Sequence, residues 1–212
     1  MVGQGVLREC LAAADVGQVT AVGRTRLEQQ HPRLRQIVQD DLADLGAVQA
    51  EVAPFDACFF CLGVSSVGKT EAQYRQVTHD LTIAIATELA RLNPAMLFTY
   101  VTGAGTDSSG RGRTMWARVK GQTENDLQRL PFAGVYLFRP GLIQPLHGIR
   151  SKTPGYQIPL TLLKPLLPLA RRLFPNYVLT TEDIGKAMLN AARQGAGRRV
   201  LEIGDIARLA RG

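Results

Sequence analysis

The feature of this sequence that most constrains its fold is a glycine that closely follows each of four apolar segments. The segments are rich in β-branched and aromatic residues, which predicts buried strands, and helical patterns separate most of them. Strands that alternate with helices predict an α/β fold with a parallel sheet. Because parallel strands end at one edge of their sheet, we expect that edge to form a binding crevice. The closing glycines are Gly23, Gly63, Gly103 and Gly141.

The clearest of these segments runs from Leu97 to Val101 and is followed by Thr102-Gly-Ala-Gly105. Such small residues let a ligand approach the backbone closely. A helix is predicted to begin near Thr114, and it carries Trp116 and Lys120 four residues apart on one face. A strand, a small-residue loop and a helix in this order are typical of a site at the strand ends of an open α/β sheet.

Weaker patterns complete the α/β prediction. The chain from Arg139-Pro140-Gly141 to about residue 159 is expected to be a loop. An apolar segment broken by prolines covers 160–174. Helices are predicted at 1–15, 45–52, 71–92, 181–195 and 205–210, and further strands at 18–23, 34–38, 55–62, 134–138 and 200–203.

Length and composition indicate one globular domain. The chain has 212 residues, of which 45% are hydrophobic, enough for a sizeable core. We expect residues 1–212 to form this domain, with 142–180 as a small substrate or lid segment. The formal net charge is +7, but the arginines are scattered, so a nucleic-acid partner is not expected. Three cysteines and no signal-peptide pattern favour a cytoplasmic protein.

The spacing Cys58-Phe-Phe-Cys61 is that of a metal or redox motif. On a strand, however, residues three apart point to opposite faces. The two thiols are therefore expected to pack in the core, and we predict no metal site.

With these strand ends in view, the chain resembles the atypical short-chain dehydrogenase/reductases, which are NAD(P)-binding Rossmann proteins. The nearest branch is that of bacterial epimerase-like proteins related to the human Tat-interacting protein. This family opens with a strand and a Gly-x-x-Gly-x-x-Gly loop, and Met1-Val-Gly3 looks like the end of that loop. The resemblance implies a Rossmann-like, doubly wound parallel sheet that lacks its first strand and first two glycines. We expect the natural reading frame to be longer, or this start to be an artefact.

The resemblance also implies a cofactor site. Arg24 follows the first strand present here, where an arginine suits the 2′-phosphate of NADP, so NADP is expected before NAD. Asp41 with Leu42 resembles the pair beside the adenine, although Asp41 is equally compatible with a helix N-cap. The other predicted cofactor-binding residues are Gly3, Leu62, Gly63, Lys120, Arg139 and Pro140.

The predicted catalytic residues are Thr102, Lys120 and Tyr100. Thr102 stands where the family has its catalytic Ser, unless it merely ends a strand. Lys120 matches the Lys of the family's Tyr-x-x-x-Lys, but Trp116 replaces the Tyr, and an indole N–H only donates a hydrogen bond. Tyr100 shares a strand face with Thr102 and could supply the missing proton. Trp116 could instead pack or form a stacking platform.

Two functions therefore remain open from the sequence. The first is an NADPH-dependent oxidoreductase that acts on an unknown carbonyl substrate. The second is a non-catalytic NADP-binding module that a partner reads through the segment 160–174. This segment could also rest on a membrane surface, although three prolines argue against one straight helix. A homodimer is left open as well.

Overall fold

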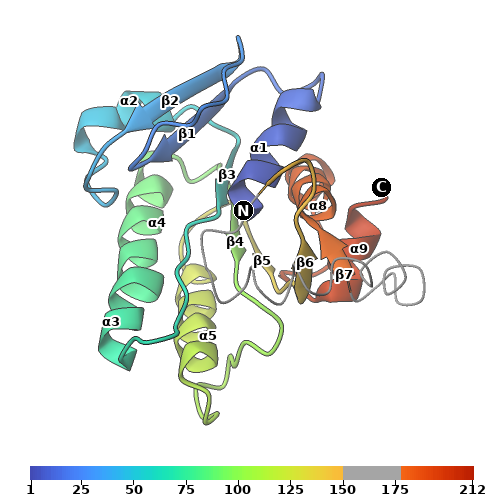
Figure 1. Cartoon of the computed structure of the whole chain (residues 1–212). Coiled ribbons are helices and arrows are strands. Elements are labelled where there is room, and N and C mark those ends of the chain that lie inside the picture. Colours follow the sequence, from blue (N-terminus) through green and yellow to red (C-terminus); the bar gives the residue numbers. More distant parts are fainter. Residues whose placement is uncertain (150–177) are drawn as a thin grey trace.

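The computed structural model describes residues 1–149 and 178–212, and Figure 1 shows how they are arranged. The segment 160–174, predicted as a lid, partner or membrane surface, lies outside the described residues. The strands are β1 (Val19–Gly23), β2 (Leu34–Val38), β3 (Ala57–Phe60), β4 (Leu97–Val101), β5 (Gly134–Phe138), β6 (Leu142–Gln144), β7 (Val178–Thr180) and β8 (Val200–Leu201). The longer helices are α1 (Val2–Ala12), α4 (Leu81–Leu92), α5 (Met115–Leu127), α8 (Thr181–Gln194) and α9 (Ile203–Leu209).

Parallel strands form the centre of the molecule, as the alternating pattern predicts. β3, β4, β5 and β8 pair in that order, and each pair is parallel. β1 and β2 also pair in parallel, but as a separate two-stranded sheet. The predicted α/β fold with parallel strands is thus confirmed, and within the described residues the sheet is interrupted between β1 and β3.

Helices cover both faces of the four-stranded sheet, which explains its apolar strands. Figure 1 shows α1, α8 and α9 on one side, with α3 (Glu71–Arg75), α4 and α5 on the other. Two hydrophobic clusters correspond to these layers. The first includes Val6, Phe138, Leu179, Ile184 and Ile206, and the second includes Phe60, Ile85, Phe98, Leu127 and Leu137.

Two glycines bring α1 against α8. A Cβ atom on Gly5 would lie 2.4 Å from the carbonyl oxygen of Thr181, and one on Gly185 would lie 2.9 Å from the carbonyl oxygen of Gly5. Backbone atoms cannot move aside as a side chain can. The close packing of α1 on α8 therefore depends on the absence of side chains at these positions.

The predicted helix at 71–92 is one continuous helix with an irregular centre. α3 begins at a capping box formed by Thr70 and Gln73. A π-helical segment, η2 (Gln76–Asp80), then leads into α4. The helix ends before Pro94, which cannot continue it.

The 3-10 helix η1 (Gly46–Val48) and the short helix α2 (Gln49–Val52) replace the single helix expected at 45–52. The expected loop after Arg139 also contains a strand: β6 pairs in parallel with β7. Three residues are too few to give a periodic signal, so the sequence did not predict it. Among the described helices, none is long and apolar enough to cross a bilayer.

The two CxxC thiols lie on opposite sides of the sheet, as predicted. Cys58 packs against the second cluster and Cys61 against the first. Burial raises the pKa of each thiol to about 12. Both cysteines are therefore protonated core residues at neutral pH.

Candidate functional site

The carboxyl ends of β4 and β5 meet in a buried polar network around Glu124. The Glu124 side chain is fully buried. Its Oε1 atom accepts a hydrogen bond from the Thr102 hydroxyl at 2.7 Å and from Arg139 Nε at 3.0 Å. Its Oε2 atom pairs with the other side of the Arg139 guanidinium and lies 3.3 Å from Ser108 Oγ. The carboxylate thus joins the ends of two strands to α5.

Glu124 was not among the site residues predicted from the sequence. Its signal was its position four residues after Lys120, which places both side chains on the same face of α5. A second signal was that Glu124 is an acidic residue in the middle of a helix that was expected to face the end of a strand. A buried carboxylate needs a charge partner, and Arg139 fills that role.

This network changes the reading of two predicted site residues. Thr102 is buried, and its hydroxyl donates toward Glu124 and lies 3.1 Å from the carbonyl oxygen of Phe138. Arg139 reaches Glu124 and, at 3.0 Å, the carboxylate of Glu202. Both side chains make contacts within the protein, and their roles beside a substrate and a nicotinamide stay predictions.

The expectation for Tyr100 requires a correction. Its side chain is only 1% exposed, and its hydroxyl donates to the carbonyl oxygen of Thr78 at 3.3 Å. Burial also raises the pKa of its phenol well above the usual value. Tyr100 therefore points into the core, where it does not serve as the proton donor that the sequence suggested.

Lys120 and Trp116 lie over the small-residue loop after β4. The Lys120 amine donates to the carbonyl oxygen of Thr102. A Cβ atom on Gly103 would lie 4.0 Å from Lys120 Nζ and 3.9 Å from Trp116 Cζ3, and one on Gly105 would lie 3.8 Å from Trp116 Cη2. These are ordinary van der Waals distances, so the backbone of the loop lies close to both side chains. The predicted strand, loop and helix thus bring the indole and the amine to the carboxyl end of β4.

Burial lowers the pKa of Lys120 to about 8, and the nearby charge of Glu124 opposes part of this effect. A lysine with such a pKa exchanges its proton near neutral pH, unlike an ordinary exposed lysine. Lys120 is therefore the group at this strand end that is best able to release a proton.

The amino end of α1 lies at the carboxyl end of β3, the strand next to β4. A Cβ atom on Gly3 would lie 3.2 Å from the Cβ of Cys61. Among the described residues, no atom outside its chain neighbours lies within 4 Å of a Cβ atom at Gly63. The first turn of α1 carries no acidic side chain. A helix N-terminus with this character favours an anion, and the backbone at Gly63 leaves room beside it.

The remaining predicted cofactor residues lie on different parts of the sheets. Leu62 packs beside the second hydrophobic cluster, and the carbonyl oxygen of Pro140 accepts from the Ala104 N–H at 2.9 Å. Arg24 is exposed directly after β1. Asp41 is exposed after β2, and its Oδ1 accepts from the Ala43 N–H at 2.9 Å. Asp41 forms a local turn and is not the helix N-cap, since the next helix begins only at Gly46.

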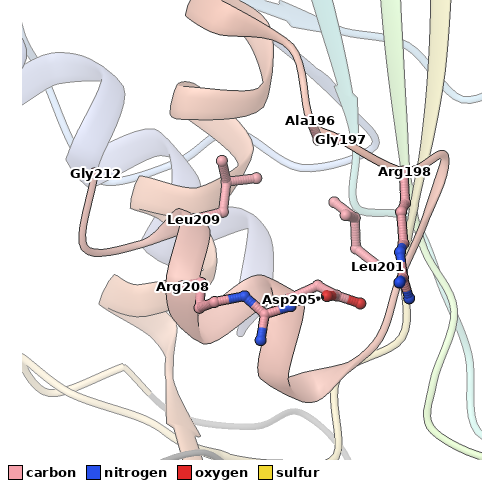
Figure 2. Close-up of a pocket in the computed structure, with 8 residues that line it drawn as sticks. All are labelled: Ala196, Gly197, Arg198, Leu201, Asp205, Arg208, Leu209 and Gly212. Carbon is pink, nitrogen blue, oxygen red and sulfur yellow. Dashed lines mark hydrogen bonds and ion pairs between the residues drawn. The ribbon is translucent and has the colours of Figure 1, made fainter.

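Two open hollows occur elsewhere on the described surface. One, of about 440 Å³, lies where α9 meets the segment before β8, and Figure 2 shows Asp205 and Arg208 side by side on α9. The other, of about 340 Å³, lies between α5 and the loop 108–110. Neither hollow contains a predicted site residue. Several charged groups that line these hollows pair with one another, so the candidate site is the one at the strand ends.

Comparison with known proteins defines the class first. No family model matches the chain. Among solved structures, the enzyme WbmH of Bordetella bronchiseptica in complex with NAD+ matches 95% of this chain and 71% of its own, with a TM-score of 0.65 and 15% identity. The fold is therefore the Rossmann-like α/β fold of NAD-binding proteins.

The sequence relatives are more specific. Protein fmp52-1 of Aspergillus oryzae is 28% identical over 149 residues, which cover 68% of this chain and 62% of the relative. Protein HTATIP2 of Rattus norvegicus is 26% identical over 143 residues, which cover 66% of this chain and 58% of the relative. The resemblance to atypical short-chain dehydrogenase/reductases of the Tat-interacting-protein branch is confirmed.

The relatives also correct the expected location. Further fungal relatives, between 23% and 28% identical, are named as mitochondrial FMP52 proteins. The cytoplasmic expectation is contradicted by these names, which describe the relatives as mitochondrial. Low cysteine content did not discriminate between these two compartments.

Proposed function

We propose that this protein binds a nicotinamide dinucleotide at the carboxyl ends of β3 and β4. One observation carries the proposal: the anion-favouring end of α1 lies at the end of β3, while Lys120 and Trp116 lie at the end of the adjacent β4. The phosphates of a dinucleotide would lie at the amino end of α1. Its polar ribose and planar nicotinamide ring would lie beside Lys120 and Trp116. The fold supports this assignment, since WbmH of the same fold is described in complex with NAD+.

We propose NADP as the preferred form. Arg24 is exposed after β1, and in dinucleotide folds an arginine at this position accommodates the 2′-phosphate. A guanidinium pairs with phosphate through two parallel hydrogen bonds.

The test is a titration with NADPH and with NADH, followed by the fluorescence of Trp116. Because the chain contains one Trp, the signal has a single source. Arg24→Ala is expected to weaken NADPH binding at least tenfold and to leave NADH binding unchanged. Arg26→Ala, at another exposed arginine of the same loop, is the matched control. Equal affinities of the wild type for the two cofactors would contradict the NADP preference, and no binding of either would contradict the proposed function.

An oxidoreductase activity is the second candidate, and Lys120 favours it. When bound, NADPH supplies a hydride. Lys120, with its pKa of about 8, would supply the proton to the carbonyl oxygen of a substrate. Trp116 cannot do so, and Tyr100 is buried in the core.

NADPH consumption with a panel of aldehydes and ketones separates this activity from a binding module. Turnover that Lys120→Met abolishes, while NADPH still binds, would support the oxidoreductase. Tight NADPH binding without turnover of any substrate would support the non-catalytic module.

A further inference from the structure

Lys120 differs from the other lysines that the structure describes. Lys186 forms an ion pair with Glu182 at 2.6 Å, and Lys69 is exposed to solvent. Lys120 is partly buried, and in the described part of the chain its amine pairs with no carboxylate but donates to the carbonyl oxygen of Thr102. Burial without an acidic partner disfavours an ammonium, whereas a neutral amine can still donate to a carbonyl. The surroundings therefore favour the neutral amine, which is the nucleophilic form.

The amine is also held in a fixed place. The Thr102 N–H donates to the carbonyl oxygen of Phe138 at 2.8 Å, and the Thr102 hydroxyl donates to Glu124 at 2.7 Å. These two bonds fix the residue whose carbonyl oxygen accepts from Lys120. The Glu124 carboxylate is itself engaged by Thr102 and Arg139. The nucleophile is thus oriented before any ligand binds.

An aromatic ring and bare backbone border the space next to the amine. Apart from chain neighbours, the described atoms within 4 Å of a Cβ atom on Gly103 would be Trp116 Cζ3, at 3.9 Å, and Lys120 Nζ, at 4.0 Å. For Gly105, the corresponding atom is Trp116 Cη2, at 3.8 Å. Trp116 and Lys120 are both partly exposed, so a small molecule can reach them from solvent. A planar group on the Gly103 backbone would touch the indole and come within reach of the amine.

We propose that Lys120 is a covalent binding site for aldehydes whose carbonyl group is attached to a planar ring. The ring would lie on the backbone of Gly103 and against the Trp116 indole, where aromatic pairs are favourable. An aldehyde carbon carries a hydrogen as its second substituent, so it is the carbonyl that a flanked amine reaches most easily. This use of the neutral amine is separate from the proton transfer proposed above, which uses the protonated amine beside a bound cofactor.

The reaction is a condensation and involves no oxidation or reduction. The lone pair of the Lys120 amine attacks the carbonyl carbon and forms a C–N bond, while the carbonyl oxygen takes up a proton. The resulting carbinolamine loses this oxygen as water, which carries away both hydrogens of the neutral amine. An imine remains between Nζ and the aldehyde carbon, and hydrolysis reverses the reaction. Lys120 would therefore capture such an aldehyde reversibly.

The test is labelling of the cofactor-free protein at pH 7.5 with benzaldehyde and sodium cyanoborohydride, which reduces an imine to a stable secondary amine. Peptide mass spectrometry measures the rates at Lys120 and at Lys69, the exposed internal reference. Lys120 is expected to react about tenfold faster than Lys69, or more. Acetaldehyde, which has no ring, is the matched probe. Trp116→Leu should lower the ratio of the Lys120 rate to the Lys69 rate about threefold with benzaldehyde and leave the ratio with acetaldehyde unchanged.

Two outcomes would overturn the proposal. In the first, benzaldehyde labels Lys120 of the wild type no faster than Lys69. In the second, Trp116→Leu changes the ratios for benzaldehyde and acetaldehyde equally, so that the ring does not use the indole. Because no cofactor is present, either failure leaves the proposed dinucleotide binding unaffected, and the titration with NADPH tests that binding separately.

Discussion

β3 and β4 are neighbours with similarly apolar sequences, yet they differ in burial. The three central residues of β4, Phe98, Thr99 and Tyr100, are at most 1% exposed. In β3, only Phe60 is buried, and the three residues before it are half-buried. β4 has strands on both sides, whereas β3 has one on only one side among the described residues. The number of flanking strands, more than the hydrophobicity of a segment, thus decides how much of it is withdrawn from water.

The largest expected effect is that of Phe98→Ala compared with Phe59→Ala. Phe98 is fully buried and stacks on Phe132 with ring centroids 4.9 Å apart. Truncation of such a side chain leaves a cavity and should lower the free energy of unfolding by about 3–5 kcal/mol. Phe59→Ala should lower the free energy of unfolding by about half as much, because the Phe59 side chain is only half-buried. Urea unfolding of both variants measures the difference, and equal losses would show that the open edge of β3 does not weaken its packing.

The next largest effect concerns the carboxylate of Glu124, which accepts a hydrogen bond from Thr102 at the end of β4. Glu124→Gln removes the buried carboxylate that pairs with Arg139, and breaking a buried ion pair at one partner is costly. We expect a loss of about 3 kcal/mol in the free energy of unfolding. Glu202→Gln removes the exposed partner of the same arginine and should cost less than about 1 kcal/mol. If the two variants lose similar amounts of unfolding free energy, the buried pair contributes no more to stability than the exposed one.

Much of the fold was predictable because the decisive patterns are local. Apolar runs that end in small residues located β1, β3, β4 and β5, and the CxxC spacing placed Cys58 and Cys61 on opposite faces. The bounds of α9 differed, since it begins at Ile203 and shortens the expected strand before it. β6 was missed, because a strand of three residues depends on its partner for its structure.

The site was predictable only in part. Spacing on one helix brought Trp116 and Lys120 together over the loop after β4. The directions of Thr102, Tyr100 and Arg139 were not predictable, because they depend on Glu124 and on the core around it. Such contacts join residues far apart in the chain, so no local pattern reveals them.

A pH effect comes from Lys120, with an expected size of up to about 3 kcal/mol. Its pKa falls from 10.5 to about 8 in the folded protein, so between these values the unfolded chain binds the extra proton. This contribution therefore raises stability as the pH rises from 8 to 10.5, and Lys120→Met should remove the rise. The phenols and thiols of raised pKa have the opposite effect, so the test is the difference between the two unfolding curves at each pH. A difference that does not change between pH 7.5 and 10.5 would contradict the lowered pKa.

The smallest expected effect concerns the two-stranded sheet that β1 and β2 form beside the four-stranded sheet. Arg33 donates to the carbonyl oxygens of Leu11, Ala13 and Val16, and so ties β2 to the carboxyl end of α1, where backbone carbonyls lack helical partners. Arg33→Ala should speed amide exchange in β1 and β2 about tenfold, with less than about 1 kcal/mol lost from global stability. Arg35→Ala, which removes a half-exposed ion pair with Glu51, should leave these rates within about twofold. If Arg33→Ala speeds exchange equally in β4 and β5, the two sheets open as one unit and not, as the interruption between β1 and β3 implies, separately.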